Sequence, residues 1–162
     1  MINWPVRQFI CPILDIMLKQ THVSAGLDIH KLFLVATILT RTHEKWTERF
    51  ERTESGLFQL KDWLISHNVQ VVACESTSDY WVKIYDLLSP SIPVIVGNAR
   101  DMKALSHKKT DKIDSEFISL LALNEMIQPS RIFLPDLREF RSTVRLRHQF
   151  VRKITAIKNE IH

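Results

Sequence analysis

Residues 25–39 read Ala25-Gly-Leu-Asp-Ile-His-Lys-Leu-Phe-Leu-Val-Ala-Thr-Ile-Leu39, an apolar run that a single acid, Asp28, interrupts near its start. A second apolar run, Val69-Gln-Val-Val-Ala-Cys-Glu75, closes on the acid Glu75. Apolar runs rich in β-branched residues predict buried strands. Both acids are therefore expected on strands inside the fold. Because burying an unpaired charge is costly, their position favours a functional role over a purely structural one.

The rest of the chain predicts alternating strands and helices. The run from Leu27 to Leu39 predicts one long strand, which forms a hairpin with a second strand at 46–52. The later elements follow from apolar spacing and from flanking proline, glycine and polar residues: a helix from 54 to about 66, a strand over 69–75, a helix over 81–88, a strand over 94–96, a short helix over 98–105 and a longer helix over 111–126. A hairpin followed by this alternation predicts an α/β fold of the ribonuclease H kind, a mixed sheet flanked by helices.

Two further acids, Asp111 and Asp114, stand three residues apart in Lys-Lys-Thr-Asp-Lys-Ile-Asp-Ser115. If this segment opens a helix, the spacing places both carboxylates on one face. Four acids in one pocket repel each other, and a hard divalent cation with oxygen ligands is the usual reason to gather them. The alternative for this pair is that helix starts attract acids in any protein.

Composition limits the classes of protein to consider. With 162 residues and 45% hydrophobic content, the chain can bury one substantial core. Only three glycines occur, which excludes a glycine-rich phosphate loop. The two cysteines, Cys11 and Cys74, follow no metal-ligand spacing, and Cys74 is expected to fill the core of a protein of the reducing cytoplasm. No apolar run approaches the length of a membrane span, so no membrane partner is expected.

The C-terminal segment is basic and has a seven-residue apolar repeat. Residues 138–162 hold seven Lys or Arg and two Glu, whereas the whole chain has a net charge of +4. Clustered cations favour a polyanion partner, although a solvated helix face explains most such segments. The apolar repeat predicts a long helix of the coiled-coil type that pairs with a partner helix, either within a longer chain or in a homodimer. Its apolar positions are Leu137, Phe140, Val144, Val151, Ile154 and Ile161.

Four short sequence motifs match those of a known family. They are Gly-Leu-Asp-Ile-His-Lys31, Glu-Ser-Thr-Ser-Asp-Tyr-Trp81, Lys-Thr-Asp-Lys-Ile-Asp-Ser115 and the stretch from Leu-Arg-Glu-Phe-Arg141 to Asn-Glu-Ile-His162. In this order and spacing they closely resemble the N-terminal half of the DEDD-type insertion-sequence transposases, which include the Piv-type pilin-gene invertases. Ser78 and Ser115 stand where the family usually has Gly and commonly has Ala, and neither difference removes an acid.

The resemblance implies a RuvC-like domain of the ribonuclease H superfamily, in which Asp28, Glu75, Asp111 and Asp114 are both the catalytic and the metal-binding residues and hold one or two Mg²⁺ or Mn²⁺ ions. It implies double-stranded DNA as a partner, oligomeric assembly and, as in some members, a structured guide RNA. In the family a coiled coil follows, and then a domain with the serine taken to be the nucleophile. We expect a poorly packed extension over 1–22, the RuvC-like domain over 23–130 and a truncated basic helix over 131–162, with the serine domain absent.

Candidate nucleic-acid contacts are the basic residues around the Asp111 and Asp114 pair and on the last helix. They are Lys108, Lys109, Lys112, Arg141, Arg145, Arg147, Arg152 and Lys153. His30 alternates to the face of Asp28, where it either approaches the metal or serves the structure. Two alternatives to a transposase domain stay open: a non-catalytic remnant that binds nucleic acid and dimerises, and a stand-alone RuvC-like nuclease.

Overall fold

The computed structural model describes residues 21–76, 79–105 and 114–161, and the expected N-terminal extension lies outside them up to residue 20. The chain divides into two compact units, residues 1–130 and 131–162. The elements of the first unit are β1 (Val23–Ile29), β2 (Phe33–Thr40), β3 (Lys45–Glu51), α2 (Glu54–Ser66), β4 (Val71–Glu75), α3 (Tyr80–Leu88), β5 (Val94–Gly97), α4 (Ala99–Ala104) and α5 (Ser115–Leu123). The second unit contains α6 (Pro135–Ile161). No helix within the described part of the chain is long and apolar enough to cross a membrane.

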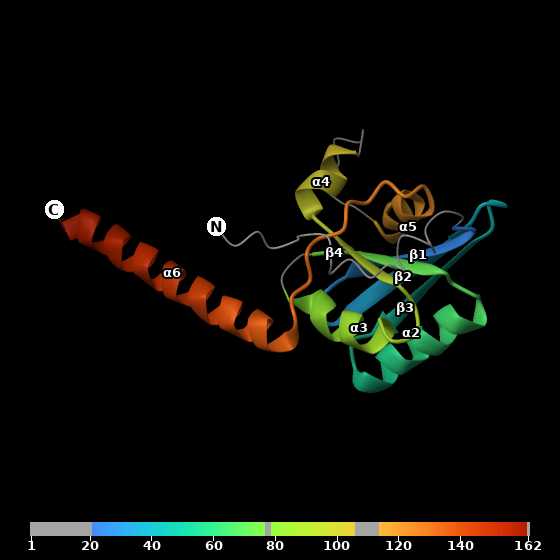
Figure 1. Cartoon of the computed structure of the whole chain (residues 1–162), viewed down its shortest axis with the longest axis horizontal. Helices are drawn as coiled ribbons and strands as arrows, with labels where there is room; N and C mark the ends of the chain where they lie inside the picture. The colour runs from blue at the N-terminus through green and yellow to red at the C-terminus, as the bar shows by residue number, and fades with distance from the viewer. Residues whose placement is uncertain (1–20, 77–78, 106–113, 162) are drawn as a thin grey trace, which may run out of the picture. The chain divides into compact units, whose positions relative to one another are not determined.

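The first unit is built on a five-stranded sheet in the order β3-β2-β1-β4-β5. The strands β1, β2 and β3 pair in antiparallel fashion, whereas β4 and β5 run parallel to β1. Figure 1 shows α2 and α3 on one side of the sheet and α4 and α5 on the other. The expected class, a mixed sheet of the ribonuclease H type flanked by helices, is therefore confirmed.

Both faces of the sheet bury apolar residues, and the two faces differ at β1 and β2. The α2 side is aliphatic, and Leu27, Leu34 and Cys74 are fully buried there. On the α5 side, β1 and β2 carry small and hydroxylated residues, among them Ser24, Gly26 and Thr37. Small side chains let a helix approach the sheet closely, so this pattern explains why α5 covers the central strand β1 directly.

The predicted long strand over 27–39 is wrong, because the structure divides this run into the antiparallel strands β1 and β2. The turn between them is His30–Leu32, which contains neither glycine nor proline. The carbonyl groups of this turn accept hydrogen bonds from Arg52, the residue after β3. The Arg52 backbone N–H donates to the Leu32 carbonyl, and its guanidinium donates to the carbonyls of His30 and Lys31. The turn is thus stabilised by a residue distant in sequence.

The helix predicted over 111–126 is shorter in the described residues, where α5 covers Ser115–Leu123. Asp114 is its N-cap residue, and its Oδ1 accepts a hydrogen bond from the backbone N–H of Phe117 at 2.8 Å. An N-cap carboxylate satisfies a backbone donor that the first turn leaves without a partner. Asp114 therefore begins the helix instead of lying on one of its faces.

The second unit consists of residues 131–134 and α6, a helix of 27 residues with no buried side chain. At about 1.5 Å per residue, such a helix is about 40 Å long. Its apolar side chains are exposed, from 37% at Val144 to 77% at Ile161. The predicted long C-terminal helix is confirmed, and its own unit buries none of its apolar residues.

Candidate metal centre

Asp28 and Glu75 stand side by side on neighbouring parallel strands. In the pairing of β1 with β4, Leu27 lies opposite Cys74, and each acid is the next residue along its strand. Side chains at matching positions of paired strands point to the same face, about 5 Å apart in the direction of the backbone hydrogen bonds. Both acids are half-buried. The sheet therefore presents two neighbouring carboxylates near the carboxyl ends of its central strands.

The helix α5 is held on the same face by a network of buried hydroxyl groups. The Ser24 hydroxyl donates to the Ser119 carbonyl at 2.9 Å, and the Ser119 hydroxyl donates to the Ser24 carbonyl at 3.1 Å. Closer to the start of the helix, the hydroxyl groups of Ser115 and Thr37 lie 2.8 Å apart. Since Thr37 pairs with Gly26, α5 runs antiparallel to β1.

This direction places Asp114, the residue before Ser115, at the end of β1 where Asp28 lies. Three of the four predicted acids, Asp28, Glu75 and Asp114, thus gather at one end of one face of the sheet. They do not form a closed ligand set: over 21–76, 79–105 and 114–161, no three His, Cys, Asp or Glu side chains are grouped closely enough to hold an ion. The fourth acid, Asp111, lies outside these ranges, as do Lys108, Lys109 and Lys112.

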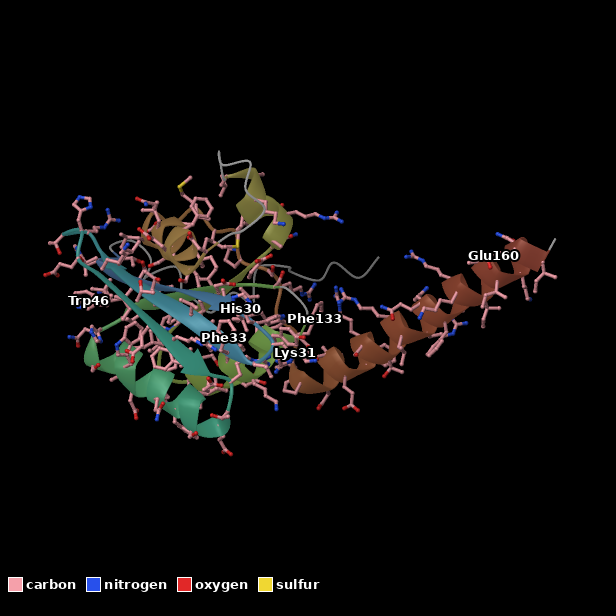
Figure 2. The ribbon with its side chains drawn as sticks, turned by 180° about the vertical axis from the view of Figure 1, so that it is seen from behind. His30, Lys31, Phe33, Trp46, Phe133 and Glu160 are labelled. Atoms are coloured by element: carbon pink, nitrogen blue, oxygen red, sulfur yellow. The ribbon has the colours of Figure 1, made fainter. Side chains whose placement is uncertain are left out.

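His30 contacts the first of these acids directly. Its Nε2 lies 3.0 Å from Oδ2 of Asp28, and its ring packs on Phe33 with 4.5 Å between the ring centroids. Figure 2 shows His30 beside Lys31 and Phe33 at this turn of the sheet. The sequence left open whether His30 approaches the metal site or serves the structure. The structure places it against the carboxylate of Asp28.

Two residues at this end of the sheet were missed by reasoning from sequence. Asn98 follows Gly97, the β5 residue that pairs with Glu75, and its Oδ1 accepts from the Arg100 backbone N–H at 3.0 Å as the N-cap of α4. An Asn between an apolar run and a helix was the available signal. Arg52 has no such signal, because only folding brings its guanidinium to the turn between β1 and β2.

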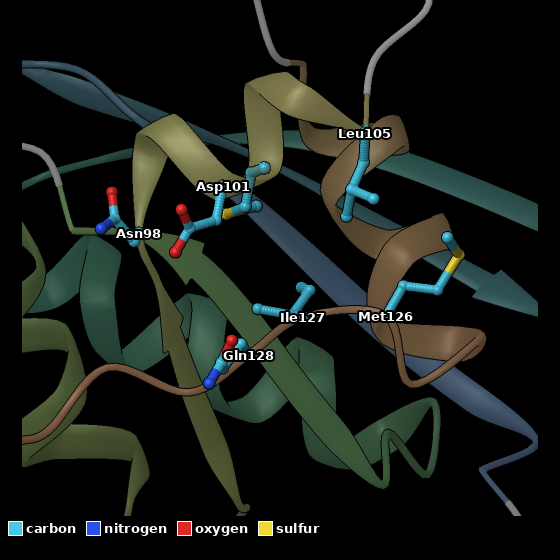
Figure 3. Close-up of a pocket in the computed structure, with 7 residues that line it drawn as sticks. Asn98, Asp101, Leu105, Met126, Ile127 and Gln128 are labelled. Atoms are coloured by element: carbon cyan, nitrogen blue, oxygen red, sulfur yellow. The ribbon is translucent and has the colours of Figure 1, made fainter.

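A cavity of about 190 Å³ lies between α4 and the segment after α5 (Figure 3). The residues that line it are Asn98, Asp101, Met102, Leu105, Met126, Ile127 and Gln128. Its walls include one acid, Asp101, and none of Asp28, Glu75 or Asp114. The three gathered carboxylates therefore do not line this cavity.

Cys74 is fully buried beside Glu75, and burial, followed by the negative charge of Glu75, raises the pKa of its thiol to about 12. We expect no alkylation of Cys74 in the folded protein and rapid alkylation after unfolding, because the thiolate is the reactive form. The folded pKa lies above the ordinary value of 9.0, so this thiol contributes stability that is complete below about pH 9 and falls as the pH rises toward 12.

Site-resolved mass spectrometry after iodoacetamide treatment, with and without urea, measures this difference at Cys74. The variant Cys74→Ala has no thiol at this position, so its free energy of unfolding should fall less steeply than that of the wild type above pH 9. Modification of Cys74 at equal rates with and without urea would contradict the prediction.

The basic residues predicted to bind nucleic acid on the last helix, Arg141, Arg145, Arg147, Arg152 and Lys153, all lie on α6 and are exposed. The Arg141 guanidinium stacks over the ring of Phe133 at 4.8 Å, within the same unit. A stacked guanidinium keeps its charge and its hydrogen-bond donors, so this contact leaves Arg141 able to meet a phosphate.

Solved structures and a protein-family model resemble parts of this chain. The resolvase of Fowlpox virus, solved in complex with its substrate Holliday junction DNA, is 15% identical with a TM-score of 0.41, over 65% of this chain and 99% of its own. RuvC of Thermus thermophilus is 11% identical with a TM-score of 0.41, over 68% of this chain and 84% of its own. No curated protein matches the sequence. A family model described as a transposase, of the DEDD and IS110 type, matches residues 25–162, and the chain therefore belongs to this family of DEDD transposases.

Proposed function

We propose that this chain is the metal- and DNA-binding domain of a transposase that acts in DNA transposition and site-specific recombination. In this proposal Asp28, Glu75, Asp111 and Asp114 hold one or two Mg²⁺ or Mn²⁺ ions at the scissile phosphate. The observation that carries it is the convergence of Asp28, Glu75 and Asp114 at one end of one face of the sheet. Membership of the transposase family supports the same reading.

The residue types of the predicted ligands suit a hard divalent cation. Carboxylate oxygens are the ligands that Mg²⁺ prefers, and the site offers them from two neighbouring strands and one helix start. One oxygen of Asp28 is engaged by His30 and one oxygen of Asp114 by the backbone of α5, so each carboxylate keeps a second oxygen for an ion. When bound, the ion supplies Lewis-acid polarisation of a phosphoryl oxygen.

The experiment that tests the metal site is calorimetric titration of Mn²⁺ into the wild type and Asp28→Asn. We expect saturable heat for the wild type and none for the variant, because the substitution replaces a charged ligand oxygen at the centre of the site. The matched control is Asp62→Asn, an exposed acid of α2 on the opposite side of the sheet, which should bind as the wild type does. Equal binding by Asp28→Asn and the wild type would refute the metal assignment.

We further propose double-stranded DNA as the polyanion that meets the basic residues of α6 and the lysines before Asp114. The basic residues of α6 are exposed, and clustered exposed cations favour counterion release on binding a phosphate backbone. A structured guide RNA offers the same phosphates, and competition between duplex DNA and RNA in a binding assay distinguishes the two.

The exposed apolar residues of α6 and its basic residues lead to separate expectations. Ile154 lies on the seven-residue repeat, so Ile154→Glu should convert a dimer to a monomer in sedimentation velocity, because it places a charge in the helix seam. A dimer that persists in Ile154→Glu would show that α6 is not the pairing element.

Arg145 lies off that repeat, so Arg145→Glu should keep the dimer and weaken DNA binding, with a shallower salt dependence.

A further inference from the structure

The turn between β1 and β2 is closed by a hydrogen bond from the His30 backbone N–H to the Phe33 carbonyl at 2.9 Å, and it is anchored further by Arg52. The Arg52 backbone N–H donates to the Leu32 carbonyl at 2.9 Å, and Nη1 donates to the carbonyls of His30 and Lys31 at 3.1 and 2.7 Å. The same guanidinium lies 4.5 Å from the centre of the Tyr80 ring, at the start of α3. Three carbonyls of a turn without glycine are thereby satisfied by one residue, which holds the backbone of His30 in place.

The imidazole of His30 is restrained as well. Its ring packs on Phe33, with an angle of 31° between the ring planes, and the guanidinium of Arg49 lies over the Phe33 ring at 3.9 Å. This stack joins the turn after β1 to β2 and β3, and it limits rotation of the His30 side chain. With backbone and ring both held, Nε2 has a defined position 3.0 Å from Oδ2 of Asp28.

The chemistry of this contact assigns its direction. An ionised carboxylate only accepts hydrogen bonds, so the Nε2–H of His30 donates to Oδ2 of Asp28. The bond fixes the rotation of the carboxylate group and directs Oδ1 away from the histidine. A ligand oriented in advance binds an ion more tightly than one that must be ordered on binding.

From these contacts we infer that His30 is a positioning residue for Asp28, held in place by the Arg52 contacts and the stack with Phe33 and Arg49. The inference rests on the proposed metal site, and it assigns His30 a role outside the ligand set. His30 acts by holding the first acid of the site in the orientation that an ion requires.

The test compares two substitutions at this position. His30→Gln keeps an N–H donor near the place of Nε2, whereas His30→Leu fills a similar volume without a donor. We expect His30→Leu to weaken Mn²⁺ binding by about 10- to 100-fold, the usual effect of losing a group that orients a ligand. His30→Gln should recover most of this loss, because the donor and not the imidazole is what Asp28 requires.

His67→Leu is the control, because it also removes a histidine that packs against aromatic rings. His67 packs between Trp46 and Trp63. Trp46 pairs with Ile38, toward the end of β2, whereas Asp28 pairs with Val35 near its start, so His67 lies away from the acids. His67→Leu should lower thermal stability and leave Mn²⁺ affinity unchanged. If His30→Leu also changes only stability, the positioning role is wrong, and if His30→Gln loses as much affinity as His30→Leu, the imidazole is itself a ligand.

A measurement without metal separates this inference from the proposed function. Long-range ¹H–¹⁵N NMR of the metal-free wild type should show the His30 proton on Nε2, and a proton on Nδ1 alone would overturn the inference whatever the metal binding. Conversely, a wild type that binds no Mn²⁺ would overturn the metal site, and with it the positioning role, even if the hydrogen bond to Asp28 is present.

Discussion

Replacing Gly26 with alanine should destabilise the first unit by about 3 kcal/mol or more, because overpacking at a closed contact forces a backbone shift. A Cβ at this position would lie 2.1 Å from the carbonyl oxygen of Ser115 and 2.3 Å from the backbone nitrogen of Ser119. Both are backbone atoms of α5, so no side-chain rotation can relieve the contact. The helix must move away from β1 and disturb the hydroxyl network that holds it.

Urea unfolding followed by circular dichroism measures this loss, and Gly97→Ala is its control. A Cβ at Gly97 would meet Sδ of Met102 at 2.5 Å and Cγ2 of Ile127 at 2.8 Å, both atoms near the ends of side chains. Because these side chains can shift, we expect a smaller loss of about 1 kcal/mol. Equal losses for the two variants would show that α5 is not packed directly on β1.

Asp114→Asn should abolish stabilisation by metal while leaving the metal-free fold almost unchanged. Asparagine caps a helix about as well as aspartate, so the hydrogen bond from the Phe117 N–H is retained while the charge is lost. In the wild type, Mn²⁺ at about 100 times its dissociation constant should raise the free energy of unfolding by about 2.7 kcal/mol. The variant should gain little of this.

Thermal melting across a series of Mn²⁺ concentrations gives the measurement. Asp114→Ala is the informative comparison, because it loses the cap as well as the charge and should be less stable by about 1 kcal/mol without metal. A melting temperature of Asp114→Asn that rises with Mn²⁺ in parallel with the wild type would remove Asp114 from the ligand set.

Much of the local structure could be predicted from sequence, and the exceptions share a cause. The buried strands ending at Glu75 and Gly97 have continuous apolar runs bounded by polar residues or prolines, and the structure places them as expected. The run of residues 25–39 is equally continuous, yet it contains two strands. Its turn contains no glycine or proline to mark the end of a strand. Arg52 stabilises this turn, and Arg52 reaches it only because β3 pairs with β2.

The same division applies to the acids. The residue types of the acids follow from the sequence, as do the place of Glu75 at the end of a strand and the expectation of a metal site. The place of Asp28 near the end of β1 does not, because the sequence predicted it near the start of one long strand. Which oxygens are already engaged does not follow, because the contacts of Asp28 with His30 and of Asp114 with the α5 backbone depend on side-chain and helix geometry.

The sequence by itself determined the order of most strands and helices, the apolar repeat of the last helix and the candidate acids, because each of these depends on neighbours a few residues away. Only the tertiary structure decided the register that sets Asp28 beside Glu75, the packing of α5 that adds Asp114, and the anchoring of the turn at His30. These features depend on residues 20 or more positions apart, such as Ser24 and Ser119, whose contact exists only when the sheet and α5 are packed together.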